Sequence, residues 1–288
     1  MKKIILSYCH YQGWGDSMVS LFDILNLTEY LKNKYSNLHV TLVINDIRNL
    51  DVEDILNEVF DMNFFREYFD NIVIQKINFD DFNNNGICNF LGTTYHRVYS
   101  GRNYDVKNNT PGIFDVYVDE NELDSFTETT QDYLNFTFDE VESREIKKYP
   151  IFNQKIIDYV NNFIKEHLTK DFESICYRAN NILDETKISD LIQKLDKRKK
   201  YFLSSNSSVI KKTIHDSIPN VKMIRGFDNE SYHLQGFPVG ENKLSDAFFS
   251  VCELYMLGEG KKIYYEGELP WVSFFVWYGR NVCKVELV

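Results

Sequence analysis

The sequence predicts an α/β protein built from two halves, each an open sheet of largely parallel strands with helices between them. Along the 288 residues, apolar runs of strand length alternate with segments that carry the apolar period of a helix. The alternation is clearest in the second half. There, two short apolar strands each end in polar residues and are joined by a helical segment, which is the pattern of a βαβ unit.

The first half is expected to contain four strands, two long helices, a stretch of acidic helical turns and two long loops. The strands are predicted at Lys3–Ser7, His39–Ile44, Asn71–Ile77 and Phe114–Val118. Helical structure is predicted at Ser17–Lys34, in acidic turns over Asp51–Phe69, and at Ile151–Leu168. The expected loops are Asp80–Asn89, rich in Asp and Asn, and Gly92–Gly112, rich in polar and aromatic residues. Loops of such length in a compact domain are usually functional or disordered.

The second half repeats the architecture without repeating the sequence. Strands are predicted at 174–178, 201–204, 221–224, Lys261–Tyr265 and Asn281–Leu287. Helices are predicted at 185–197, 207–216, Leu244–Leu257 and Pro270–Tyr278. We therefore place one Rossmann-like half at residues 1–168 and the other at 169–288. A cleft is expected between the carboxyl ends of the two sheets, where open α/β sheets bind their ligands.

Composition excludes several classes of function. Hydrophobic residues make up 43% of the chain, enough for a substantial core, and the net charge is −11. A nucleic-acid partner is not expected, because binding to phosphate backbones needs clustered Lys and Arg. The basic run Lys197–Lys200 is expected to be structural, since it falls at the end of a predicted helix, where cations favour the dipole.

The cysteines and the N-terminal residues indicate in which cellular compartment the protein is expected. The five cysteines are widely spaced without a Cys-x-x-Cys pair, so neither a zinc site nor a disulfide framework is expected. The apolar stretch Ile4–Leu6 is too short for a signal or membrane segment. The sequence thus predicts a cytoplasmic protein without a transmembrane segment.

Two neighbouring strand ends carry the residues expected to bind a nucleotide. The strand Ser174–Tyr177 runs directly into Arg178, and Tyr201–Leu203 runs into Ser204, Ser205 and Asn206. An arginine beside a hydroxyl-rich helix start suits a diphosphate. Two alternatives remain open, because Arg178 could form a structural ion pair and Asn206 with Ser207 could be an ordinary helix start.

The loop after the first strand is the second candidate region. Gly13 and Gly15 allow the backbone to approach a ligand closely, and Asp16 or Ser17 can cap the following helix. As a dinucleotide fingerprint the loop is incomplete, since a third glycine is missing. Facing the cleft, Asp16 or His10 could serve as a general base.

These residues and their order resemble the fucosyltransferase-like enzymes of the GT-B class, which include bacterial α-1,2- and α-1,6-fucosyltransferases and protein O-fucosyltransferases. The Gly-x-Gly-Asp loop, the strand end Cys176–Asn180, the strand Tyr201–Asn206, and helix Leu244–Leu257 with the segment Glu266–Phe274 occur in the family's order over most of the chain. The resemblance implies that Arg178 contacts the diphosphate of GDP-fucose. It also implies that Ser273 and Phe274 lie at a helix start facing phosphate, although Ser273 could merely hydrogen-bond within its helix.

The chain departs from the family pattern at several positions. Cys176 stands where the family has histidine, Ala179 where it has a second arginine, and Asn181 where it has aspartate. Of the family's final serine cluster only Ser273 is kept. GDP-fucose is therefore the first assignment for the donor, and another sugar nucleotide remains open.

The polar-aromatic loop is expected to supply the acceptor site. Its candidate residues are Tyr95, His96, Arg97 and Arg102. Such a mixture suits sugars, which stack on aromatic rings and accept hydrogen bonds from charged groups. The alternative is a surface loop without special function.

The resemblance implies an inverting, metal-independent transfer of a sugar to a glycan hydroxyl. Asp16, or His10 second, would take the acceptor's proton while Arg178 stabilises the departing diphosphate. No metal or other cofactor is expected beside the nucleotide-sugar donor. A non-catalytic protein that binds a glycan or nucleotide is the main alternative. A nucleotide-sugar epimerase or reductase is disfavoured, because the chain lacks a Gly-x-Gly-x-x-Gly motif after its first strand.

Overall fold

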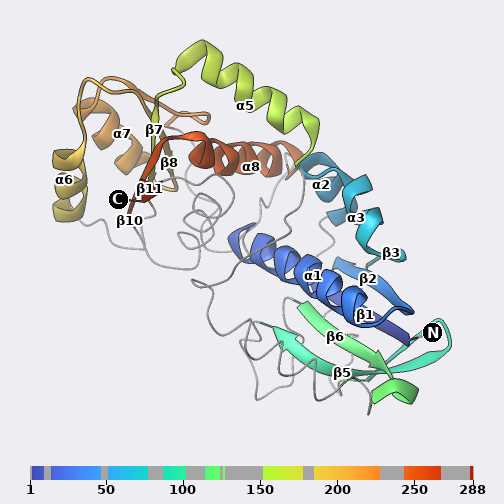
Figure 1. Cartoon of the computed structure of the whole chain (residues 1–288). Coiled ribbons are helices and arrows are strands. Elements are labelled where there is room, and N and C mark those ends of the chain that lie inside the picture. The colour runs from blue at the N-terminus through green and yellow to red at the C-terminus, as the bar shows by residue number, and fades with distance from the viewer. Residues whose placement is uncertain are drawn as a thin grey trace. The chain divides into compact units, whose positions relative to one another are not determined.

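The computed structural model describes two compact units (Figure 1). The residues it describes are 2–9, 14–46, 51–76, 87–101, 114–123, 126, 152–177, 185–227, 243–266 and 286–287. One unit contains Met1–Gln12 and Asp16–Ile151, and the other contains Phe152–Val288 together with Gly13–Gly15. Each unit is built on one sheet.

The first unit has a six-stranded mixed sheet in the order β3-β2-β1-β6-β5-β4. Its strands are β1 (Lys2–Cys9), β2 (Leu38–Asp46), β3 (Asn71–Lys76), β4 (Ile87–Phe90), β5 (Thr93–Gly101) and β6 (Phe114–Asp119). Its helices are α1 (Trp14–Lys34), α2 (Val52–Val59) and α3 (Met62–Tyr68), with a 3-10 turn at Glu120–Glu122. Strands β1, β2 and β3 are parallel, whereas β6, β5 and β4 follow in antiparallel steps.

The antiparallel half of this sheet corrects the expectation of a continuous loop over Gly92–Gly112. Residues 93–101 form β5, which pairs with β4 on one side and with β6 on the other. The hairpin between β4 and β5 turns at Leu91 and Gly92, both with positive φ, and the side chain of Leu91 is 86% exposed. Leucine rarely adopts this left-handed conformation, so Gly92 is the only ordinary turn residue of this pair.

Strands β1 and β2 are buried because they are apolar on both faces. Ile4 of β1 and Leu42 of β2, on one face, are at most 1% exposed, and Ile5 and Val43, on the other face, are at most 4% exposed. Asp46 is the last residue of β2. Its Oδ2 accepts hydrogen bonds from the backbone amides of Asp51 and Val52, at 2.9 and 3.3 Å, where α2 starts. Its carboxylate therefore caps the start of α2.

The second unit has a five-stranded sheet in the order β11-β10-β7-β8-β9, all of it parallel. The strands are β7 (Glu173–Tyr177), β8 (Tyr201–Ser205), β9 (Val221–Lys222), β10 (Lys262–Glu266) and β11 (Glu286–Leu287). The helices are α5 (Gln154–His167), α6 (Glu185–Lys194), α7 (Ser208–Ser217) and α8 (Lys243–Glu259). The expected helix Pro270–Tyr278 lies outside the described residues.

Helix α5 belongs to the second unit, although the sequence analysis placed it at the end of the first half. It lies alongside α8 (Figure 1) through aromatic contacts: the ring centroids of Tyr159 and Phe248 are 5.5 Å apart. Phe163 of α5 also contacts Phe202 of β8, with centroids 6.2 Å apart. Contacts between these rings join α5 to the second sheet.

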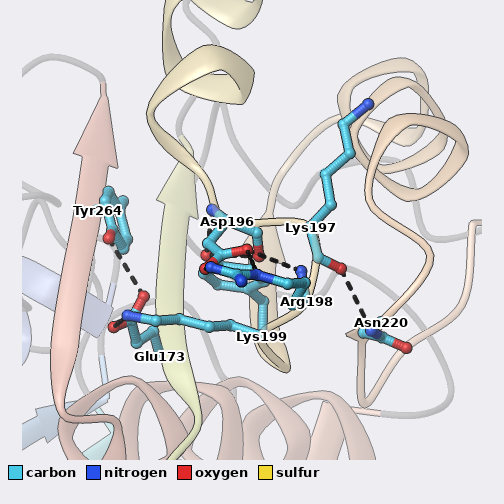
Figure 2. A network of polar contacts seen from close by, with 8 residues as sticks. Glu173, Asp196, Lys197, Arg198, Lys199, Asn220 and Tyr264 are labelled. Atoms are coloured by element: carbon cyan, nitrogen blue, oxygen red, sulfur yellow. Dashed lines mark hydrogen bonds and ion pairs between the residues drawn. The ribbon is translucent and has the colours of Figure 1, made fainter.

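The basic run Lys197–Lys200 lies at the start of β8, at the amino-terminal end of the second sheet (Figure 2). Helix α6 ends at Lys194, so the run lies in the turn beyond the helix. Arg198 pairs with Asp196 at 2.8 Å, and Lys199 pairs with the buried Glu173, which also accepts a hydrogen bond from Tyr264. The pairing with Arg198 lowers the pKa of Asp196 to about 2. These contacts give the run a structural role.

Gly260 is expected to tolerate no side chain. A Cβ on Gly260 would lie 2.3 Å from Ser174 Oγ and 3.0 Å from the Ser174 backbone nitrogen, inside the fully buried start of β7. Gly260→Ala should therefore lower the free energy of unfolding by about 1–3 kcal/mol, measured by denaturant titration. Gly226→Ala is the matched control, because a Cβ there meets nothing within 4 Å. Equal stability of the two variants would contradict the prediction.

Candidate functional site

The polar end of β8 forms the centre of the candidate site in the second unit. Ser204 and Ser205 end the strand, Asn206 follows, and all three are buried. In the parallel pairing of β7 with β8, Tyr177 lies opposite Ser205. Arg178, the next residue after Tyr177, lies outside the described residues. The two strand ends that the sequence singled out are thus adjacent in the sheet.

Residues after β8 start α7 at the same edge. The Ser207 side chain accepts a hydrogen bond from the Ile210 amide at 3.4 Å and caps the helix, and Ser205 Oγ accepts one from the Ser207 amide at 3.3 Å. The helix dipole places partial positive charge at this end, which favours an anion. The helix start is therefore both a structural cap and a suitable phosphate contact.

Ser204 faces the opposite side of the sheet and contacts α8. Its hydroxyl donates a hydrogen bond to Glu253 Oε2 at 2.9 Å, and its side chain has no exposed surface. The other carboxylate oxygen, Oε1, accepts from Arg225 Nε at 3.0 Å. Ser204 and Arg225 therefore hold the buried carboxylate of Glu253 from two directions.

Arg225 follows β9 in a segment without regular structure, and α7 holds the same segment. Lys211 of α7, itself buried, donates from Nζ to the carbonyl oxygens of Arg225 and Gly226 at 3.4 and 3.2 Å. Sequence reasoning missed Lys211, Arg225 and Glu253. The available signal was a single carboxylate inside the apolar helical stretch Val251–Leu254.

Cys252, next to Glu253, takes no part as a nucleophile. Burial, reinforced by the negative charge of Glu253, raises the pKa of the thiol to about 12. A thiol with this pKa stays protonated at neutral pH, and only the thiolate is nucleophilic.

Several predicted residues fall on or next to α1. The helix begins at Trp14, so Gly15 and Asp16 lie in its first turn, and the expectation that Asp16 caps the helix is wrong. A carboxylate in the first turn still interacts favourably with the helix dipole. The side chain of Asp16 lies outside the described part of the structure, as do His10, Gly13, Ser273 and Phe274.

Three of the four predicted acceptor residues, Tyr95, His96 and Arg97, lie on β5 rather than in a loop. Tyr95 is buried on one face of the sheet with Ile5, Val43 and Tyr117. Arg97, in register with Tyr117, is on that same face, while His96 is on the other face, with its Nε2 3.9 Å from Glu120 Oε2. Strand alternation thus separates His96 from its neighbours. Arg102 lies outside the described residues.

A row of polar side chains at the carboxyl ends of β1, β2 and β3 was missed by sequence reasoning. Gln75 Nε2 donates to Asn45 Oδ1 at 2.7 Å, and Asn45 Nδ2 donates to Ser7 Oγ at 2.7 Å. Asp115 of β6 is in register with Ser7 and is fully buried. The carboxyl ends of both sheets are therefore polar, and in α/β proteins such ends bind ligands.

Comparisons with known proteins identify the fold. No protein-family model matches the chain, and no curated protein matches its sequence. The fucosyltransferase NodZ from Bradyrhizobium matches with a TM-score of 0.51 at 15% identity, covering 97% of this chain and 92% of NodZ. POFUT1 in its apo form matches with a TM-score of 0.51 at 10% identity, covering 100% of this chain and 97% of POFUT1. The chain has the GT-B fold of these fucosyltransferases.

The fucosyltransferase fold confirms the resemblance seen in the sequence. NodZ α-1,6-fucosyltransferase soaked with GDP-fucose is a further match, with a TM-score of 0.51 at 16% identity, covering 98% of this chain and 92% of that one. Because these identities are low, the comparison establishes architecture rather than residue roles. The matches extend over nearly the whole chain, so both units share the fold.

Proposed function

We propose that the protein is a glycosyltransferase that moves a sugar from a nucleoside diphosphate to a hydroxyl group of a glycan. The observation that supports it most is the polar end of β8, with Ser205, Asn206 and the start of α7, in a fold shared with fucosyltransferases. NodZ has been co-crystallised with GDP and soaked with GDP-fucose. GDP-fucose is therefore the first donor to assign to this chain.

In this proposal the second unit binds the donor. Arg178 contacts the diphosphate, and amides at the start of α7 add partial positive charge beside it. Ser205 and Asn206 contact the nucleotide, whereas Ser204 acts through Glu253 because its hydroxyl is buried against that carboxylate. Four further residues complete the proposed donor-binding set: Gly13, Gly15, Ser273 and Phe274.

The proposed transfer inverts the donor's anomeric carbon in a single displacement. An acceptor hydroxyl attacks that carbon, the bond from the carbon to the diphosphate oxygen breaks, and a base takes the hydroxyl proton. Asp16 is the first candidate for the base and His10 the second. The first unit binds the acceptor, with Tyr95, His96, Arg97 and Arg102 as its proposed contacts.

In this proposal, groups of the protein stabilise the negative charge on the leaving diphosphate. Arg178 and the start of α7 are these groups, so the reaction needs no metal ion. Among the residues that the structure describes, no three His, Cys, Asp or Glu side chains are arranged to hold a metal. Within the same ranges, no helix has the length and apolar character needed to cross a membrane.

Thermal unfolding with a nucleotide panel tests the proposal. The panel contains GDP, UDP, CDP, TDP and their sugars, each with and without magnesium. We expect GDP and GDP-fucose to raise the melting temperature with concentration, independently of magnesium. A ligand at 100 times its Kd adds about 2.7 kcal/mol to the free energy of unfolding, which such a measurement resolves.

Other outcomes of this panel change the proposal in defined ways. Stabilisation by UDP alone would keep the glycosyltransferase and replace the donor. Binding of GDP without transfer or hydrolysis of GDP-fucose would favour a non-catalytic binding protein, which the replacement of the family histidine by Cys176 also favours. No stabilisation by any nucleotide would overturn the proposed use of a nucleotide sugar.

A further inference from the structure

The turn at Arg225 and Gly226 is held from both faces of the second sheet by charged side chains. Glu253 of α8 accepts the Nε–H of Arg225 at 3.0 Å, and Lys211 of α7 donates to the carbonyl oxygens of Arg225 and Gly226. The side chains of Arg225 and Glu253 are only 13% and 4% exposed. Two helices on opposite faces thereby fix a segment that has no regular secondary structure of its own.

Holding a turn with buried charged side chains costs desolvation free energy. Removing an ion pair from water costs about as much free energy as the pair returns, and apolar side chains of similar size often stabilise a fold better. The chain nevertheless brings Lys211, Arg225 and Glu253 together at this one turn. Structural support alone does not account for the choice of residues.

The turn lies beside the proposed donor site. Tyr201 is in register with Val221, and Phe202 with Lys222, so the parallel strand β9 leads its following segment toward the carboxyl end of β8. Ser204 and Arg225 share the carboxylate of Glu253, which confirms their proximity. Gly226 is exposed, and a Cβ there would meet nothing within 4 Å, so open space adjoins the turn.

We infer that Arg225 is a second positively charged contact for the diphosphate of the nucleotide donor, oriented by Glu253 and by the turn that Lys211 holds. This inference rests on the proposed function. A guanidinium has five N–H donors on a planar fork, so the edge bearing Nε can bind Glu253 while other donors bind phosphate oxygens. Ser204, by fixing Glu253, is a positioning residue for this contact.

Calorimetric titration with GDP tests the inference, using wild-type protein and Arg225→Gln. Because a charge-assisted hydrogen bond contributes about 1.5–3 kcal/mol, the Kd for GDP should rise by about tenfold or more. Guanosine, which lacks phosphate, is titrated by ligand-observed NMR, and its Kd should change less than twofold. The matched control is Arg198→Gln, an ion-paired arginine that is 90% exposed at the opposite end of the sheet.

A second variant distinguishes a specific loss of GDP binding from unfolding of the protein. Arg225→Gln leaves Glu253 buried without this partner, whereas the double variant Arg225→Gln with Glu253→Gln removes both charges. The double variant should unfold near the wild-type temperature and still bind GDP weakly. Folded Arg225→Gln that binds GDP within threefold of wild type would overturn the inference, as would equal losses for GDP and guanosine. Wild-type protein that binds no nucleoside diphosphate would overturn the proposed function as well.

Discussion

Arg178→Ala is expected to lower kcat/KM for sugar transfer by at least about 100-fold, the usual effect of removing a group that stabilises charge in the transition state. In the proposed reaction Arg178 stays charged at every working pH and donates to the leaving diphosphate, and no neutral side chain substitutes for it. The measurement is the initial rate of GDP release from GDP-fucose, with acceptor glycans and with water alone.

Stability provides the control for this prediction. Arg178→Ala should unfold within a few degrees of wild type, and Arg198→Ala, which removes an exposed arginine at the other end of the same sheet, should keep full activity. If Arg178→Ala retained wild-type turnover, the proposed donor site would have to be abandoned. Loss of activity accompanied by unfolding would instead favour the alternative that Arg178 forms a structural ion pair.

Glu253→Ala is expected to lower the free energy of unfolding by about 3–5 kcal/mol, because it leaves Arg225 buried without its carboxylate. It also removes the acceptor of the Ser204 hydroxyl, which is fully buried. Urea titration followed by circular dichroism measures the change. Glu253→Gln should lose less, since its amide oxygen can still accept one of the two hydrogen bonds.

An exposed ion pair supplies the comparison for Glu253. Asp171 pairs with Lys261, and both side chains are mostly exposed. Asp171→Ala should therefore have a much smaller effect, because exposed pairs are screened by solvent. A Glu253→Ala protein as stable as Asp171→Ala would show that the buried network contributes nothing to the fold.

The core of the second unit was predictable from local sequence. Strands predicted at 174–178 and 201–204 are β7 (Glu173–Tyr177) and β8 (Tyr201–Ser205), and the helix predicted at 207–216 is α7 (Ser208–Ser217). Parallel strands covered on both faces are short continuous apolar runs, and the intervening helices carry the 3.6-residue period. Such patterns depend on neighbouring residues only.

Other features depend on contacts that local patterns do not contain. The β4–β5 hairpin has no long apolar run, and its turn places Leu91 beside Gly92 at positive φ, which is not one of the common hairpin turn pairs. Glu253 contacts Ser204 and Arg225 across 49 and 28 positions of the chain. That the carboxyl ends of β7 and β8 lie side by side as a candidate site could be predicted from the sequence, whereas the contacts of Glu253 could be found only from the folded chain.

The position of the first strand in each sheet bears on how the chain folds. In each unit that strand is internal, with the next strand along the chain on one side and a much later strand on the other: Ile4 pairs with Val118, and Ser174 with Ile263. Until synthesis reaches β6, one side of β1 lacks its partner, and the same holds for β7 until β10. Unpaired edges of this kind invite aggregation, and such late contacts slow folding. Ribosome-bound chains that stop before β6 or β10 therefore carry the greatest risk of misassembly.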